Sequence, residues 1–150
     1  FLILMFVGGC AASTTCGIKI FRFQVLNLFI KKQIKQIIYP NGVFPIKYRG
    51  EIVGDTFLTS VLTFVFLYIF IFFLLTALLS LSNLDFTTAI SAAATSLSNV
   101  GPGLGEIIGP NGSFKYLPDL TKWYLSIAML LGRLEFFTVL VLFLPSFWRN

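Results

Sequence analysis

Residues 98–105 form the stretch whose residue types and spacing best suit ion chemistry. They read Ser98-Asn99-Val100-Gly101-Pro102-Gly103-Leu104-Gly105. Glycine and proline exclude a helix here, and a backbone outside helical geometry can turn its carbonyl oxygens toward a cation. At membrane depth, such a backbone is tolerated only where it is buried in protein or lines water. Residue chemistry alone leaves two interpretations open, a selectivity filter and an ordinary extracellular loop.

A second run of small and hydroxyl residues covers positions 8–17. It reads Gly8-Gly9-Cys10-Ala11-Ala12-Ser13-Thr14-Thr15-Cys16-Gly17. One interpretation is close helix packing through small residues, and the other is a break in a membrane helix that lines a pore. The glycine and hydroxyl residues weaken a helix substantially, so the composition favours the break.

Arg133 is the third candidate, because it interrupts a long apolar segment. It lies about 15 Å along a helix from Trp123, near the middle of a bilayer. A charge there needs a partner or a water-filled cavity and marks a functional site by default. Glu135 points to nearly the opposite side of the helix and cannot pair with Arg133. If residues 8–17 are an unwound loop, their backbone carbonyls could accept hydrogen bonds from the guanidinium. A purely structural pair between helices is the alternative.

The composition requires a membrane. Hydrophobic residues make up 57% and charged residues 11% of the 150 positions, and the mean hydropathy is +0.89. Average proteins have roughly 45–50% apolar and about 25% charged residues. The chain lacks histidine, which removes catalytic triads and His-ligated metal sites, and Cys10 and Cys16 lack zinc spacing. The sequence therefore predicts an integral membrane protein that is not an enzyme, with two reduced thiols.

Three apolar segments define the second part of the chain. Phe57–Leu81 contains 25 residues without a charge and is the clearest transmembrane span. Thr87–Leu97 is rich in threonine, alanine and serine and is too short to cross, which indicates a re-entrant helix. Trp123–Phe147 is the second long span, and residues 106–118 form a polar loop before it.

The first part of the chain alternates between membrane and surface. Phe1–Val7 is predicted to be the end of a transmembrane helix cut at residue 1, and Ile18–Tyr39 a further helix. Pro40-Asn41-Gly42 predicts a turn, and Val43–Gly54 a short basic loop. The second half of 18–39 is amphipathic, with one face formed by Ile30, Ile34, Ile37 and Ile38 and another by Lys31, Lys32 and Lys35.

The distribution of charge predicts the orientation. Seven of the eleven basic residues lie between Lys19 and Arg49, so this region should be cytoplasmic. Residues 84–118 hold one lysine against two acids and should be outside, and the tail with Arg149 should return to the cytoplasm. For the lysine face, a solvated surface near anionic lipid and a docking site for a cytoplasmic subunit both remain open. Nucleic acid is not an expected partner.

Helix, short re-entrant helix, glycine-rich stretch and helix are together the two-span pore-loop unit of cation channels. The predicted fold class is therefore an all-α integral membrane protein with pore-loop repeat architecture, related to potassium channels.

Several motifs together resemble the membrane subunit of Trk-type potassium uptake systems, within the Trk/Ktr/HKT superfamily. The resemblance runs in order along nearly the whole chain. The motifs are Phe6-Val7-Gly8-Gly9-Cys10-Ala11, Gly17-Ile18-Lys19, Tyr39-Pro40-Asn41-Gly42-Val43, Ser98–Gly105, Gly132-Arg133-Leu134-Glu135 and Leu142-Phe143-Leu144-Pro145-Ser146-Phe147-Trp148.

The resemblance implies four pore-loop repeats around one pore, of which this chain is the C-terminal part. Residues 1–54 would end the third repeat, as a broken membrane helix with an intramembrane gate loop at 8–17 and then a cytoplasmic basic segment. Residues 55–150 would be the fourth repeat, with a span at 57–81, a pore helix at 87–97, a filter at 98–105 and a span at 123–147.

The resemblance also implies site residues and partners. Ser98, Asn99, Val100, Gly101, Pro102 and Gly103 would form the filter quarter, with potassium bound by carbonyls near Val100 and Gly101. Arg133 would face the pore beside the gate loop. Potassium would be the substrate, with no bound cofactor. The partners would be the remaining repeats, a second copy of the subunit, a cytoplasmic nucleotide-binding regulatory ring and lipid, in a multi-pass protein of the bacterial inner membrane.

One departure concerns the gate loop. Ala12, Thr15 and Cys16 stand where the family's usual loop has glycine. A less flexible loop is expected to affect gating rather than the fold. The rival hypothesis is a non-conducting membrane fragment or an anchoring module of a transport complex.

Overall fold

The computed structural model describes residues 2–9, 16–42, 44–48, 51–52, 54–82, 84–105 and 107–134. These residues are mainly helical, with one two-stranded antiparallel ribbon. The elements are α1 (Leu2–Phe6), α2 (Ile20–Ile38), β1 (Lys47–Tyr48), β2 (Glu51–Ile52), α3 (Asp55–Leu81), α4 (Phe86–Ser98), the 3₁₀ helix η1 (Phe114–Tyr116) and α5 (Asp119–Arg133).

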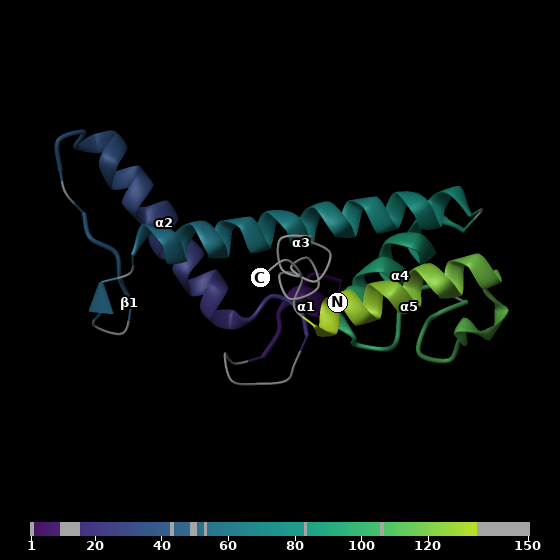
Figure 1. Ribbon diagram of the computed structural model, residues 1–150. Helices are drawn as coiled ribbons and strands as arrows, with labels where there is room; N and C mark the ends of the chain where they lie inside the picture. The colour runs from purple at the N-terminus through teal and green to yellow at the C-terminus, as the bar shows by residue number, and fades with distance from the viewer. Residues whose placement is uncertain are drawn as a thin grey trace, which may run out of the picture.

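Helix α3 is the long axis of the molecule. Its 27 residues rise about 40 Å, enough to cross a hydrocarbon core of about 30 Å with tilt. Within the described residues it is the one helix long and apolar enough to span a membrane, with a mean hydropathy of 2.8 in an 18-residue window of Thr56–Leu81. Helix α2 and the ribbon lie beside one end of α3, while α4 and α5 lie beside the other (Figure 1).

Helix α2 packs on the first turns of α3. Val25 of α2 forms a small buried cluster with Leu58 and Val61 of α3 and with Ile46, which precedes β1. The predicted basic loop over 43–54 is wrong in its central part, because β1 and β2 pair there as an antiparallel ribbon. Tyr48 stabilises the ribbon by packing on this cluster and donating its hydroxyl to Oε1 of Gln24 at 3.1 Å.

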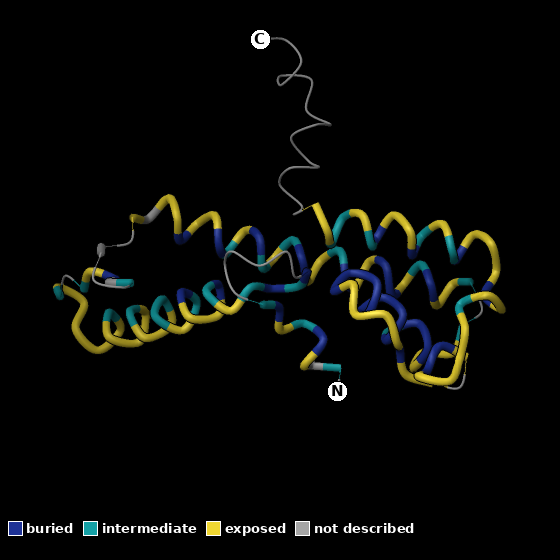
Figure 2. Tube along the Cα trace, turned by 90° about the horizontal axis from the view of Figure 1, so that it is seen from below, coloured by how far each residue is buried: buried dark blue, intermediate teal, exposed yellow. Residues whose placement is uncertain are grey.

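Helix α4 is the most deeply buried helix among those described, and its residues from Ser91 to Ser98 are all buried (Figure 2). Small side chains such as Ala89, Ala92 and Ala93 let α3 and α5 approach its backbone closely. Asp85 caps its N-terminus by accepting from the backbone N–H of Thr87 at 3.3 Å and from the Thr87 hydroxyl. The hydrogen bond from that hydroxyl lowers the pKa of the Asp85 carboxyl.

Helix α5 differs in both bounds from the predicted span at 123–147. It starts earlier, at Asp119, where Lys122 pairs with the Asp119 carboxylate at 3.0 Å, and it ends at Arg133. Residues 135–147 of the predicted span, with Glu135, lie outside the described residues. Arg133 therefore lies in the last turn of α5 instead of the middle of a continuous described helix.

Candidate ion pathway

The carboxyl end of α4 leads directly into the predicted filter segment. Asn99 ends the helix in the left-handed region, with φ of 51°. Its backbone N–H donates back to the carbonyls of Thr95 and Ser96, and its side-chain Nδ2 donates to the carbonyl of Met129 on α5 at 3.1 Å. The turn that starts the filter segment is thus held by α4 and α5 together.

Two successive amides after this turn bond back to Thr95. The N–H of Val100 donates to the Thr95 carbonyl at 3.1 Å, and the N–H of Gly101 donates to the Thr95 hydroxyl at 3.0 Å. The described peptide bonds are trans, and a trans peptide directs its N–H and C=O to opposite sides. The carbonyls of Asn99 and Val100 consequently point away from α4.

Gly101 supplies the conformation that this segment needs. Its φ of +109° is one that residues with a side chain rarely adopt, and an added Cβ would meet no described atom within 4 Å. Val100 beside it is 44% exposed, although α4 just before it is buried. The backbone at 100–101 thus borders open space on one side, while its N–H groups are hydrogen-bonded to Thr95 of α4.

Helix α3 supports the segment from its other side. The Tyr68 hydroxyl and the Ser98 hydroxyl lie 2.9 Å apart in a buried hydrogen bond. Tyr68 is 1% exposed and stacks on Phe64 within the same helix. Ser98, the first predicted filter residue, is therefore fixed to the long apolar helix α3.

The chain after the predicted filter segment folds back onto that segment and onto α4, a feature that the predicted polar loop at 106–118 did not include. The N–H of Gly103 donates to the Ile108 carbonyl at 2.7 Å, and Ser91 of α4 donates to the Leu104 carbonyl at 2.9 Å. Ile108 and Leu117 are buried in the main core. The local sequence around these two residues is typical of a loop, so their burial results from packing against segments distant in the sequence.

The predicted break at 8–17 separates α1 from α2. Val7 and Ile18 form a parallel bridge, in which Gly8 donates to the Ile18 carbonyl at 3.0 Å and Ile18 to the Phe6 carbonyl at 3.0 Å. The described residues on either side are thus paired, non-helical backbone. The remaining predicted gate residues, Cys10, Ala11, Ala12, Ser13, Thr14 and Thr15, lie outside the described residues.

Arg133 approaches this segment through Cys16. Its Nη1 lies 3.7 Å from the Cys16 sulfur, and Cys16 is a buried free thiol. The sequence predicts that Arg133 finds its partner in residues 8–17, and the sulfur contact lies in that segment, although the expected partners were backbone carbonyls.

Arg22 has a specific environment that sequence reasoning missed, because it counted the residue only as part of a basic region. It is 9% exposed, and its guanidinium carbon lies 3.8 Å from the ring centroid of Phe64 and 5.1 Å from that of Phe21. Cation–π contacts of this kind stabilise a desolvated arginine. The one sequence feature that could have indicated a cation–π contact for Arg22 is the aromatic residue next to it, Phe21.

Comparison with known proteins places these features in a class. The family model described as "TrkH: Cation transport protein" matches residues 1–150, which assigns the chain to the class of cation transport proteins. Within that class, the chain belongs to the TrkH family. This confirms the resemblance to Trk-type systems and identifies a family of ion transporters rather than enzymes.

Three relatives are similar along nearly the whole chain. They are the Trk system potassium uptake proteins TrkI of Halomonas elongata (51% identical over 150 residues, 100% of this chain and 30% of the relative), TrkH of Vibrio parahaemolyticus (38% over 145 residues, 97% and 29%) and TrkG of Escherichia coli (39% over 149 residues, 99% and 30%). The chain thus spans about 30% of the length of these relatives.

The fold agrees with that of a solved family member. The crystal structure of the potassium transporter TrkH from Vibrio parahaemolyticus matches with a TM-score of 0.87 and 36% identity, over 99% of this chain and 31% of that one.

Proposed function

We propose that this chain forms part of a potassium transport pathway across a membrane, as the fourth pore-loop unit of a Trk-type subunit. Helix α3 is the first span of the unit, α4 the pore helix and Ser98–Gly103 one quarter of the filter. The observation that carries the proposal is the direction of the peptides at 99–101, whose amides bond to Thr95 and leave the carbonyls pointing away from α4.

The mechanism needs no covalent chemistry and no bound cofactor. Potassium is the substrate, and the carbonyl oxygens near Val100 and Gly101 replace part of its hydration shell. The carboxyl end of α4 adds the negative end of its dipole close to these carbonyls, which favours a cation. Each repeat contributes one such quarter, so a complete ring requires the remaining repeats of the polypeptide.

Gating is assigned to residues 8–17 and Arg133. The paired backbone at Val7 and Ile18 supports a fixed frame for the loop, and the contact between Arg133 and Cys16 joins that frame to α5. A cation held there repels a passing ion, and movement of the loop would change that barrier.

Membership of the family supports a proposal for the wider assembly. The share of about 30% of the relatives' length fits one repeat together with the end of another. We place the subunit in the bacterial inner membrane, as a homodimer beside a cytoplasmic nucleotide-binding regulatory ring.

The test replaces Gly101 by serine in the polypeptide that carries this chain. A serine at φ of +109° is strained by about 1–3 kcal/mol, so the carbonyls should move and discrimination of potassium over sodium should fall about tenfold or more. The measurement is the ratio of potassium to sodium flux in proteoliposomes, normalised to inserted protein. Gly54→Ser is the matched control, because Gly54 has φ of −67° and open space around it.

An inserted Gly101→Ser variant with the wild-type ion preference and potassium affinity would contradict the filter assignment. Residues 98–105 would then be a plain loop, as in the non-conducting alternative.

A further inference from the structure

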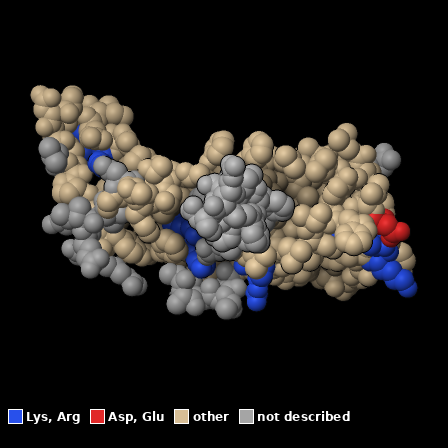
Figure 3. Space-filling model, in the orientation of Figure 1, with Lys and Arg blue, Asp and Glu red and all other residues tan. Residues whose placement is uncertain are grey.

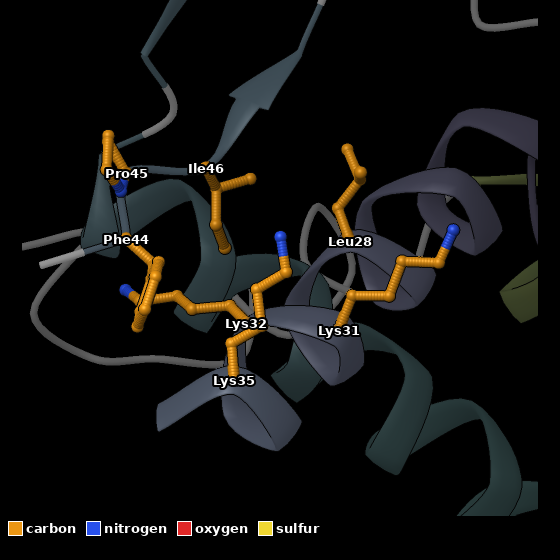
Figure 4. A pocket seen from close by; sticks show the side chains of 7 residues that line it. All are labelled: Leu28, Lys31, Lys32, Lys35, Phe44, Pro45 and Ile46. Atoms are coloured by element: carbon orange, nitrogen blue, oxygen red, sulfur yellow. The ribbon is translucent and has the colours of Figure 1, made fainter. Parts of the chain in front are cut away.

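A basic notch lies between α2 and the segment before β1. Four residues on one face of α2, Leu28, Lys31, Lys32 and Lys35, follow the spacing i, i+3, i+4 and i+7. Phe44, Pro45 and Ile46 lie across from them and close the other side (Figure 4). The notch encloses about 160 Å³, the volume of about five water molecules, which suits a phosphate group.

The charge of the notch suits an anion. Seven residues in the described part of the chain line the notch, of which three are lysines and none is acidic. The surrounding sequence reinforces this, since residues 1–50 contain seven basic residues and no acid. Lys31 and Lys35 are exposed, so their ammonium groups are accessible, whereas Lys32 is half-buried and has another interaction. Of the apolar lining residues, Ile46 is buried and Leu28 is half-buried.

The same half of α2 exposes an apolar ridge next to the lysines. Ile30, Ile34, Ile37 and Ile38 recur at helical spacing and are 50%, 53%, 79% and 61% exposed, respectively. A third side of the helix packs on α3 through Val25. A helix with an exposed apolar ridge beside a lysine face is typical of one that lies at the membrane–water boundary.

We propose that the notch binds the phosphodiester headgroup of an anionic phospholipid, with the acyl chains of that lipid along the ridge of isoleucines. The inference rests on the membrane placement of the chain and adds a lipid site to the proposed function. A dissolved anion would use the lysines and leave the ridge in water. A lipid satisfies both surfaces at once, which is why it is the favoured occupant.

The experiment compares two pairs of lysines in the polypeptide that carries this chain. The test variant is Lys31→Gln with Lys35→Gln. The control is Lys115→Gln with Lys122→Gln, which removes the same charge at the far end of the molecule, near η1 and α5. Binding of fluorescent phosphatidylglycerol to protein in phosphatidylcholine nanodiscs gives an apparent affinity for each.

The test variant should bind phosphatidylglycerol about thirtyfold more weakly, from roughly fivefold for each lysine near the surface. The control should bind like the parent protein. Lys31→Arg with Lys35→Arg should keep near-parental affinity, because the charge is retained at the same positions. Lys31, Lys35 and Lys115 are exposed side chains outside the buried clusters. The half-buried Lys122 pairs with Asp119 at the surface, where the loss of one ion pair costs little stability, so all the variants should fold like the parent.

Two results would overturn the proposal. Equal loss in the test and control variants would mean that only net charge attracts the lipid. Displacement of phosphatidylglycerol by an equal concentration of inorganic phosphate would mean that the notch is a site for a dissolved anion. Because lipid retention is the readout, a failure of the potassium-transport proposal leaves this result interpretable.

Discussion

Thr95 accepts hydrogen bonds from two successive peptides of the proposed filter segment. Its carbonyl accepts from Val100 and its hydroxyl from Gly101, so one residue fixes two consecutive peptides. Neither bond is visible in the sequence, because both depend on the left-handed turn at Asn99 that brings the chain back over the helix end. A hydroxyl near the end of a buried helix thus orients the backbone of the proposed filter.

The hydrogen bond between Tyr68 and Ser98 should contribute to stability in a way that a double-mutant cycle can isolate. Tyr68→Phe and Ser98→Ala should each lower the free energy of unfolding by about 1 kcal/mol, since each removes the buried hydrogen bond between the two hydroxyls. The double variant should lose little more than either single one. Thermal unfolding in detergent measures all three, and strictly additive losses would show that the two hydroxyls do not interact.

Arg133→Ala should raise potassium flux if the arginine helps to close the pathway. At about 5 Å and an effective dielectric constant of about 20, the guanidinium repels a potassium ion by roughly 3 kcal/mol, which is more than about a hundredfold in rate. The substitution also removes the contact with Cys16. Flux in proteoliposomes, normalised to folded protein, provides the measurement.

Arg133→Lys serves as the matched variant for this experiment. It retains the positive charge and loses the planar guanidinium, so its flux should stay near that of the parent. A folded Arg133→Ala protein with unchanged or reduced flux would indicate a purely structural arginine.

At the scale of elements, the contact between α4 and α5 positions both candidate regions. Gly132 packs against the end of α4 so closely that an added Cβ would lie 2.1 Å from the Leu97 carbonyl oxygen. The next residue along α5 is Arg133, and the proposed filter residues follow Leu97 along the chain. A single close contact between helices thus relates the proposed filter to the arginine beside the proposed gate loop.

Gly132→Ala should therefore destabilise the protein and disturb both regions. The backbone oxygen of Leu97 cannot move aside as a flexible side chain would, and overpacking typically costs about 1–3 kcal/mol. The melting temperature in detergent should fall, whereas Gly54→Ala, with open space around its Cβ, should leave it nearly unchanged. Equal melting temperatures for the two variants would mean that α4 and α5 are packed less tightly than the structure shows.

The sequence predicts the helices well where local signals are strong. The uncharged run at 57–81 and the small-residue run at 87–97 correspond to α3 and α4 with shifts of one or two residues, because length and hydropathy are local properties. The ribbon at 47–52 and the burial of Ile108 were not predictable in this way. Both depend on packing against segments distant in the sequence.

In the candidate site, too, the features set by local sequence could be predicted, and those set by long-range contacts could not. The glycine-rich composition of the filter segment indicated a non-helical backbone, and Gly101 has the positive φ that only glycine adopts readily. The supporting contacts from Thr95 and Tyr68 could not be found by motif, because one follows from a turn and the other from the crossing of α3 and α4.

At the scale of the whole molecule, the basic segment and the proposed filter segment lie at opposite ends of α3. The basic helix α2 and the ribbon lie beside the start of α3, whereas α4 and α5 lie beside its second half (Figure 1). On the face seen in Figure 3, a small acidic patch lies beside basic side chains at the end of the molecule opposite α2. If α3 crosses the membrane, the basic end and this opposite end are therefore exposed to different compartments.

This arrangement predicts which ends can be labelled from outside. Lys47 lies in the ribbon at the basic end, and Lys115 lies in η1 at the other end. Because basic residues are retained in the cytoplasm, Lys47→Cys should react with an impermeant maleimide only after the membrane is opened, and Lys115→Cys should react in intact cells. The parent protein, with its buried Cys16, provides the background.

The reverse pattern would invert the orientation of α3 and place the notch on the outer side. Labelling of both positions in intact cells would mean that α3 does not cross the membrane, and the re-entrant interpretation of α4 would then be wrong.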